Sequence, residues 1–150
     1  ARFFSYNYKA ISVANLQHLY TLNKRYNSSD GNTGFANESL YHNEADKVMD
    51  IVTEKCDDLF DLTSDEFDFK TASGVLNIDF GSSIGIWVLN KQAPNQQLWL
   101  SSPISGPHHY DFCSSNKQWV SSKDGHSLCA LLQNEFSQVV GSEVGFDEDF

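Results

Sequence analysis

Apolar and acidic residues recur between residues 39 and 62 with the period of an α-helix. At about 100° of rotation per residue, the apolar positions fall within an arc of about 120°. This apolar arc contains Tyr41, Ala45, Val48, Met49, Val52, Cys56, Leu59 and Phe60. A second arc, of roughly 80° on nearly the opposite side, contains Asp46, Asp50, Glu54, Asp57 and Asp61. We therefore predict a helix from Ser39, as N-cap, to Leu62, with one buried side and one acidic side.

From Glu66 onward the period of the pattern is two, which is typical of β-strands. Six strands are predicted, at Phe67–Lys70, Val75–Phe80, Ile84–Asn90, Gln97–Ser102, His109–Phe112 and Gln118–Ser121. Their links are short and contain Gly, Pro or Asn, as expected between antiparallel neighbours. A second helix is predicted at about His126–Val140, where leucines and valines recur at helical spacing. The predicted fold class is α+β, a two-layer α/β sandwich with both helices on one face of an antiparallel sheet of about five to six strands.

Charge is distributed unevenly along the 150 residues, whose net charge is −10. The first 29 residues contain four of the ten bases and no acid, so the remainder sets 20 acids against six bases. An acidic body of this kind repels nucleic acid and anionic membrane surfaces and favours cations and basic proteins. The chain also has no run of 18 apolar residues. We expect neither nucleic acid nor a membrane among its partners.

The N-terminal segment has bases, hydroxyls and aromatic residues, a composition typical of a mitochondrial transit peptide. An ordinary basic arm is the alternative. We expect residues 1–38 to be a transit peptide followed by a flexible linker, residues 39–141 to be the folded domain, and residues 142–150 to be a loose acidic tail.

The acidic arc of the first helix is the first candidate for chemistry. Only Lys47 and Lys55 relieve the charge along it, although like charges at i and i+4 destabilise a helix by a few tenths of a kcal/mol per pair. Dense carboxylates suit Mg, Ca, Mn or iron at exposed, weak sites, and His42 adds an imidazole one turn before Asp46. A solvated face or a docking strip is the alternative. Because the acidic arc faces away from the apolar arc, an enclosed di-iron centre is not expected.

A second candidate lies in Asn90–Pro107, which is rich in side-chain amides and contains Trp99. A period of two directs Gln97 and Trp99 to one face of the strand and the two neighbouring leucines to the other. If the leucines face the helices, Trp99 is held on the open face among hydrogen-bonding groups, which is typical of a protein interface. The alternative places Trp99 in the core and two leucines in water.

Other motifs are interpreted as structural. The three cysteines form no CxxC pair, so neither a zinc module nor a disulfide framework is predicted, and Cys56 is expected in the core. His108 and His109 point to opposite faces of a strand and are not expected to chelate together. The segment Gly81–Gly85 matches GxSxG but joins two strands, whereas a nucleophile elbow requires a turn from a strand to a helix.

The stretch Asn90–Asp111, NKQAPNQQLWLSSPISGPHHYD, closely resembles the central signature of frataxin. The likeness extends to YHNEAD at Tyr41–Asp46, SGVLNIDF at Ser73–Phe80 and DGHSL at Asp124–Leu128, and covers roughly residues 39–140. This resemblance implies an α/β sandwich protein of the mitochondrial matrix that takes part in iron–sulfur cluster assembly. It also implies weak binding of ferrous or ferric iron and docking on the complex of cysteine desulfurase and scaffold protein, where sulfur transfer is accelerated.

Two sets of residues follow from the resemblance. The implied iron-binding residues are His42, Asp46, Asp50, Glu54, Asp57, Asp58, Asp61, Glu66 and Asp68. The implied docking residues are Asn90, Gln92, Asn95, Gln97, Trp99 and His109. If an arginine normally reaches the partner at the last position, His109 would make that contact shorter and sensitive to pH.

Two further functions stay open. One is a ferroxidase or iron-storage protein that oxidises ferrous iron at clustered surface carboxylates, an activity often attributed to the family that the chain resembles. The other is an acidic adaptor that steers a basic partner without physiological iron binding. We predict no catalytic residue and no enclosed active site.

Overall fold

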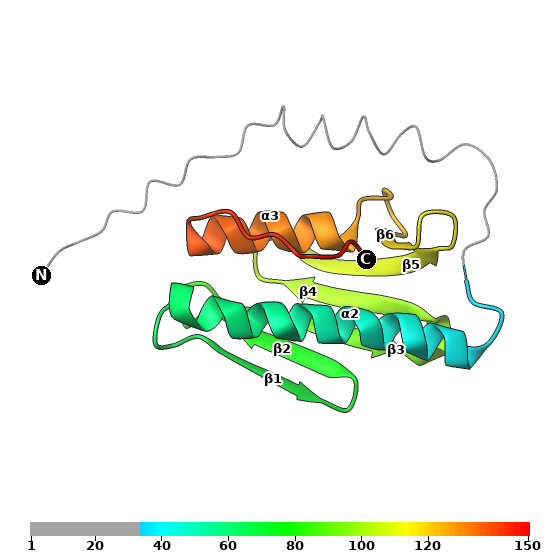
Figure 1. Ribbon diagram of the computed structural model, residues 1–150, viewed down its shortest axis with the longest axis horizontal. Coiled ribbons are helices and arrows are strands. Elements are labelled where there is room, and N and C mark those ends of the chain that lie inside the picture. The colour runs from blue at the N-terminus through cyan, green and yellow to red at the C-terminus, as the bar shows by residue number, and fades with distance from the viewer. Residues whose placement is uncertain (1–33) are drawn as a thin grey trace, which may run out of the picture. The chain divides into compact units, whose positions relative to one another are not determined.

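The computed structural model describes residues 34–150, so the predicted transit peptide and most of the predicted linker lie outside the described residues. Helix α2 (Glu38–Leu59) is followed by six strands and helix α3 (Leu128–Val140). Both helices lie on the same side of the sheet, as Figure 1 shows. None of the helices within the described part of the chain is long and apolar enough to cross a membrane.

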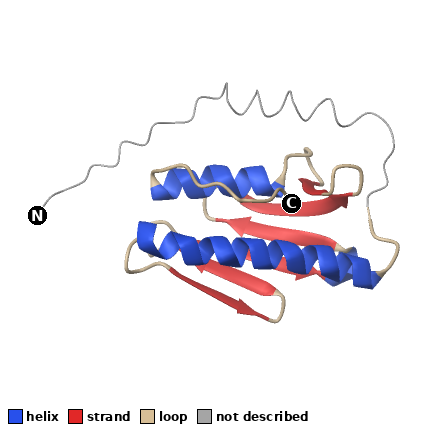
Figure 2. Ribbon diagram, in the orientation of Figure 1, coloured by secondary structure: helices blue, strands red, loops and turns tan. Residues whose placement is uncertain are grey.

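The six strands form one antiparallel sheet in the order of the sequence. They are β1 (Asp68–Ala72), β2 (Val75–Asp79), β3 (Ile86–Gln92), β4 (Gln97–Ser102), β5 (Gly106–Cys113) and β6 (Gln118–Ser121). In Figure 2 the helices form one layer and the strands the other. The predicted two-layer α/β sandwich is confirmed, and each predicted strand is found with its ends shifted by at most three residues.

Helix α2 begins two residues earlier than predicted and ends differently. Asn37, not Ser39, is the N-cap, and its side chain accepts a hydrogen bond from the backbone N–H of Leu40 at 3.0 Å. At its other end the helix tightens into the 3₁₀ turn η1 (Phe60–Leu62). A 3₁₀ turn has three residues rather than 3.6, which rotates Phe60 out of the apolar arc, and its side chain is 48% exposed. The other seven residues of the arc are buried, as predicted.

Helix α3 starts two residues later than predicted, because the residues before it are still tied to the sheet. Ser127 forms an isolated antiparallel bridge with Val120, and its side chain caps the helix by accepting from the backbone N–H of Ala130. The helix ends at Gly141, whose φ of 80° is the left-handed conformation that glycine adopts without steric cost.

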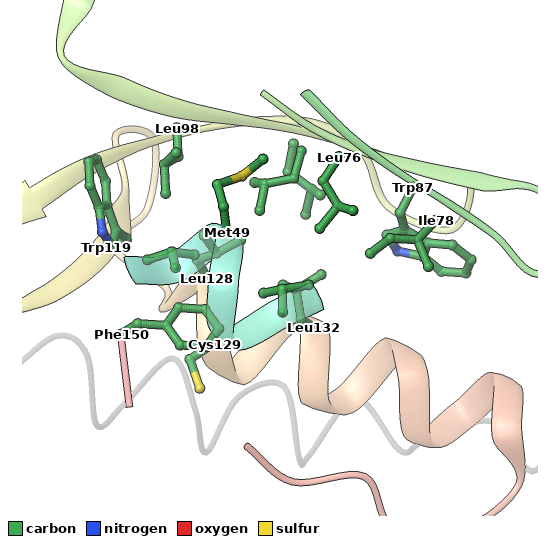
Figure 3. Close-up of a cluster of buried hydrophobic side chains, with 14 of the residues drawn as sticks. Met49, Leu76, Ile78, Trp87, Leu98, Trp119, Leu128, Cys129, Leu132 and Phe150 are labelled. Atoms are coloured by element: carbon green, nitrogen blue, oxygen red, sulfur yellow. The ribbon is translucent and has the colours of Figure 1, made fainter. Parts of the chain in front are cut away.

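The core lies between the helices and the sheet. Figure 3 shows side chains from the strands, including Leu76, Trp87 and Leu98, meeting Met49 of α2 and Leu132 of α3. The largest side chains buried there include both Trp87 and Trp119, which supply much of the apolar area removed from water. Cys56 is fully buried, as predicted for a core thiol.

The packed domain begins before residue 39. The ring of Phe35 stacks on Phe112 with 4.8 Å between centroids, and it meets Tyr41 edge-on at 5.7 Å. The backbone N–H of Phe35 also donates to Gln96 Oε1 at 3.1 Å. A chain cut at residue 39 would lose these contacts together with the N-cap, so a truncated protein for measurement is best begun at residue 34 or earlier.

The acidic tail is not loose. Val144 and Phe150 are buried, and Phe146 packs against the core from a half-buried position. Ser137 of α3 accepts a hydrogen bond from the backbone N–H of Val144 at 2.8 Å. The prediction of a loose tail was wrong because it rested on the acids, which outnumber the apolar residues of this segment. The few apolar side chains determine where the segment lies, since they are buried against the core.

Candidate functional site

The acidic arc of α2 forms an exposed ridge, as predicted. All five residues of the arc are exposed, and so is Asp58 beside them; we call these six residues the ridge: Asp46, Asp50, Glu54, Asp57, Asp58 and Asp61. His42 is half-buried one turn before Asp46, and its Nε2 lies 3.4 Å from Glu38. Within residues 34–150, no three histidine, cysteine or acidic side chains come together closely enough to hold a metal ion. The ridge therefore presents separate carboxylates to solvent and is not a preformed cage.

Glu66 and Asp68 follow the 3₁₀ turn η1, just before and at the start of β1. Glu66 Oε2 accepts from the backbone N–H of Ser82 at 3.0 Å, which secures the β2–β3 loop. Asp68 pairs in register with Asp79 on β2, while the neighbouring Phe69 is packed against the core. Because side chains alternate along a strand, Asp68 and Asp79 share the sheet face that the helices leave open. Within residues 34–150, neither of these two predicted ligands joins acids of α2 in a group of three that could hold a metal ion.

Three lysines approach the acidic residues of α2 or the tail. Lys55 Nζ lies 3.1 Å from Asp58, and Lys47 Nζ lies 3.4 Å from Glu148. Lys91 forms an ion pair with Asp46. The sequence reasoning missed Lys91, although the alternation of β3 contained the signal, since Lys91 has the same parity as the core residue Leu89 and therefore faces the helices.

The C-terminal tail adds carboxylates to the ridge. A groove between α2 and the tail is lined by Ile51, Glu54, Lys55, Asp57, Asp58, Phe146, Asp147 and Glu148. The tail residues reach this position because the neighbouring apolar side chains hold the segment against the core. Reasoning from the sequence missed this contribution, because it treated the tail as unattached.

The orientation predicted for Trp99 is confirmed. Leu98 and Leu100 are buried beneath the helices, whereas Gln97 and Trp99 are half-buried on the open face of the sheet. The indole stacks on His109 of β5 with 4.3 Å between ring centroids and 12° between ring planes. Its Nε1 donates to Gln97 Oε1 at 2.8 Å. Both contacts restrict the orientation of the Trp99 ring.

Side-chain amides surround Trp99 on this face. Asn90 lies opposite Trp99 in the β3–β4 register, Gln92 lies opposite Gln97, and Asn95 is exposed in the 3₁₀ turn η2 (Ala93–Asn95). We call the six residues Asn90, Gln92, Asn95, Gln97, Trp99 and His109 the amide–Trp strip.

Asp111 and Ser122 support the strip and were missed from the sequence. Gln97 Nε2 donates to Asp111 Oδ1 at 2.8 Å, and Ser122 Oγ donates to Asp111 Oδ2 at 2.7 Å. The Asp111 carboxylate therefore orients the amide of Gln97, whose oxygen in turn accepts from the indole. Asp111 lies two residues after His109 in β5, so the period of two places its side chain on the same face as the strip.

The two adjacent histidines are separated, as predicted. His109 is exposed beside Trp99, whereas His108 lies on the helix side and meets His126 edge-on at 5.2 Å. Burial, followed by the nearby His126, lowers the pKa of His108 below its ordinary value. The GxSxG segment is the loop between β2 and β3, so its interpretation as a hairpin is also confirmed.

The three thiols differ in environment, and Cys113 should react first. Partial burial acts to raise the pKa of Cys113, but hydrogen bonds from the Ser115 side chain and from the backbone of Asn116 outweigh it and lower that pKa. Burial raises the pKa of Cys56 to about 12 and that of Cys129 to about 11. Because the thiolate is the nucleophile, iodoacetamide should alkylate Cys113 in the folded protein and the other two only after unfolding. Peptide mapping by mass spectrometry tests this order, and equal labelling of Cys56 in the folded protein would contradict it.

Comparison with known proteins identifies the family. A family model described as a frataxin-like domain matches residues 35–142. A frataxin homolog of Schizosaccharomyces pombe is 35% identical over 135 residues, which covers 88% of this chain and 85% of that relative. The chain belongs to the frataxin family. A frataxin of Caenorhabditis elegans is 37% identical over 115 residues, covering 73% of this chain and 84% of that relative. Both relatives are named as mitochondrial proteins, and the predicted mitochondrial location is confirmed.

Solved frataxin structures have the same architecture. The trimeric frataxin of Saccharomyces cerevisiae, in a crystal structure complexed with ferrous iron, superposes with a TM-score of 0.59 at 33% identity, covering 66% of this chain and 87% of that one. A frataxin from Psychromonas ingrahamii superposes with a TM-score of 0.61 at 23% identity, covering 75% of this chain and 99% of that one. The second comparison supports the fold alone, and the first adds that a related frataxin has been seen with iron.

Proposed function

We propose that this frataxin binds ferrous iron weakly along α2 and docks through the amide–Trp strip on the complex of cysteine desulfurase and scaffold protein. In this way it would regulate iron–sulfur cluster assembly in the mitochondrial matrix. The observation that carries the proposal is the half-buried Trp99 on the open sheet face, where His109 and Gln97 hold its ring. A rigid aromatic side chain with adjacent polar groups is the usual anchor of a protein interface.

The placement of the carboxylates supports iron as a transient cargo. Exposed carboxylates such as Asp50 and Glu54 retain their water, and each offers one or two hard oxygen ligands. Such sites bind and release a divalent ion readily, whereas an oxidation site needs several ligands fixed around the metal. Ferrous iron in a related yeast frataxin supports this choice of metal.

The proposed function is tested by a desulfurase stimulation assay on residues 34–150, with and without ferrous iron, under anaerobic conditions. Stimulation in both conditions, stronger with iron, is expected. Stimulation that is equal in both conditions would favour the adaptor function over the iron-binding one. Consumption of oxygen on addition of ferrous iron in air, with no effect on the desulfurase, would favour the ferroxidase. No effect in either assay would reject the proposal.

Neutralising Asp46, Asp50 and Asp57 together, each to asparagine, is expected to weaken ferrous iron binding roughly fivefold, since each carboxylate contributes modestly at an exposed site. Stability should change by less than about 0.5 kcal/mol, because relief of like-charge repulsion at i and i+4 offsets the loss of the ion pair between Asp46 and Lys91. Anaerobic titration calorimetry and urea unfolding measure the two quantities.

The matched control for the triple variant neutralises Asp65, Glu143 and Asp149, three exposed acids that lie outside α2 and outside the implied iron-binding set. The control removes the same net charge and should weaken iron binding by less than twofold. An equal loss in both variants would show that the net charge of the protein, and not the ridge, attracts the metal.

A further inference from the structure

Lys91 is the one described base that reaches the ridge from the sheet. It lies in β3, its backbone N–H donates to the carbonyl of Gly74 at 2.9 Å, and its methylene stem lies alongside Gly74. Only 13% of its side chain is exposed. The ammonium therefore arrives at α2 on a stem that the β1–β2 turn and the helix already confine, so little rotamer entropy remains to be lost.

The ammonium of Lys91 pairs with Oδ1 of Asp46, whose own side chain is 59% exposed. This exposure leaves the carboxylate of Asp46 open to solvent as well as to Lys91. The other two lysines near α2 pair with different exposed acids: Lys47 with Glu148 of the tail, and Lys55 with Asp58. Among the described residues, no base pairs with Asp50, Glu54 or Asp57.

We propose that Lys91 determines where along α2 a divalent cation binds, by occupying Asp46 as an internal cation with which the metal must compete. This inference rests on the proposed binding of iron by the ridge. A metal ion that shares Asp46 with the ammonium experiences repulsion from a unit positive charge a few ångströms away, in addition to losing one of the two carboxylate oxygens. The metal therefore binds first around Asp50, Glu54 and Asp57, and the end of the ridge near His42 stays empty at low metal concentration.

The test uses Mn²⁺ as the probe, because it prefers oxygen ligands, does not oxidise in air and broadens nearby NMR signals. It is added to the full chain, and the loss of backbone amide signals is followed separately around Asp46 and around Asp57. In the unaltered protein the signals around Asp57 should disappear at a lower Mn²⁺ concentration than those around Asp46.

Lys91→Met keeps the methylene stem and removes the charge. This variant is expected to lower the Mn²⁺ concentration needed to broaden the signals around Asp46 by roughly three- to tenfold, the effect of removing one unit charge at this distance in a solvated site. The signals around Asp57 should change by less than twofold. Lys47→Met is the matched control, since it removes the same charge one residue from Asp46 on a side chain that points to the tail.

Four results would overturn the inference. The first is an unchanged response around Asp46 in Lys91→Met, and the second is an equal enhancement in Lys47→Met. Either result would remove the specific role of Lys91 while leaving metal binding by the ridge intact. The third is no broadening along α2 in any variant, which would reject the proposed iron function itself. A double variant with Asp46→Asn should abolish the gain seen in Lys91→Met, and persistence of that gain would also count against the proposal.

Discussion

Replacing Trp99 with alanine is expected to raise the concentration needed for half-maximal desulfurase stimulation by about thirtyfold or more. The indole is half-buried on the free protein and stacks on His109, so its ring is already ordered when the partner arrives. Ordered aromatic anchors contribute about 2 kcal/mol or more to binding, which corresponds to roughly a thirtyfold change in affinity. The fold should persist, because Trp99 lies outside the core between helices and sheet.

The control for Trp99→Ala is Asn77→Ala, which lies on the same open face but in β2, away from the strip. That variant should stimulate the desulfurase within twofold of the unaltered protein. Ferrous iron affinity should be unchanged in both variants, because the ridge lies on the helix layer. A parallel loss of iron affinity and stimulation in Trp99→Ala would mean that the two surfaces are not separate.

Gln97 shows why the orientation of the strip could be predicted from the sequence. The alternation of Gln97, Leu98, Trp99 and Leu100 admits two orientations, and only one of them buries the leucines. Once the residues of a strand that face the core are known, a period of two also gives the residues on its other face. Both the open face and the acidic side of α2 were predictable because the chemistry of each is set by residues close together in sequence.

The contacts that could not be predicted join residues far apart in the chain. Lys91 and Asp46 are separated by 45 positions, and no local pattern states that the stem of Lys91 crosses from β3 to α2. The position of the tail likewise depends on the packing of Phe150 into the core, which forms only when the helices and the sheet have come together. At the start of α2, Asn37 and Ser39 are both good capping residues, and the local sequence does not distinguish between them.

Glu135 makes a further set of contacts between residues far apart in the chain. It lies on α3 among buried apolar residues and is 2% exposed. Its Oε2 accepts from the indole Nε1 of Trp87 at 2.7 Å and from Ser102 Oγ at 2.7 Å. Ser102 Oγ in turn accepts from the backbone N–H of Ile104 at 3.0 Å. One carboxylate therefore ties α3 to β3 and to the β4–β5 turn.

Glu135→Ala is expected to lower the free energy of unfolding by about 3 kcal/mol, because it leaves the buried indole N–H and the Ser102 hydroxyl without their shared acceptor and opens a cavity. Glu135→Gln should lower it by about half as much, since the amide oxygen can still accept while the charge-assisted component is lost. Urea unfolding followed by circular dichroism measures both variants. Glu143→Ala, at an exposed position after α3, is the control and should change stability by less than about 0.5 kcal/mol.

The order of the two Glu135 variants separates a hydrogen-bonding role from a packing role. If Glu135→Gln and Glu135→Ala are equally destabilising, the negative charge itself is required. Hydrogen bonds from the two neutral donors would then not explain why the fold is stable with a buried carboxylate. If Ala is no worse than the Glu143 control, Trp87 and Ser102 find other partners, and the network does not hold the turn. The graded loss is expected because the described residues offer Glu135 no basic partner, so donated hydrogen bonds are what stabilise the carboxylate against burial.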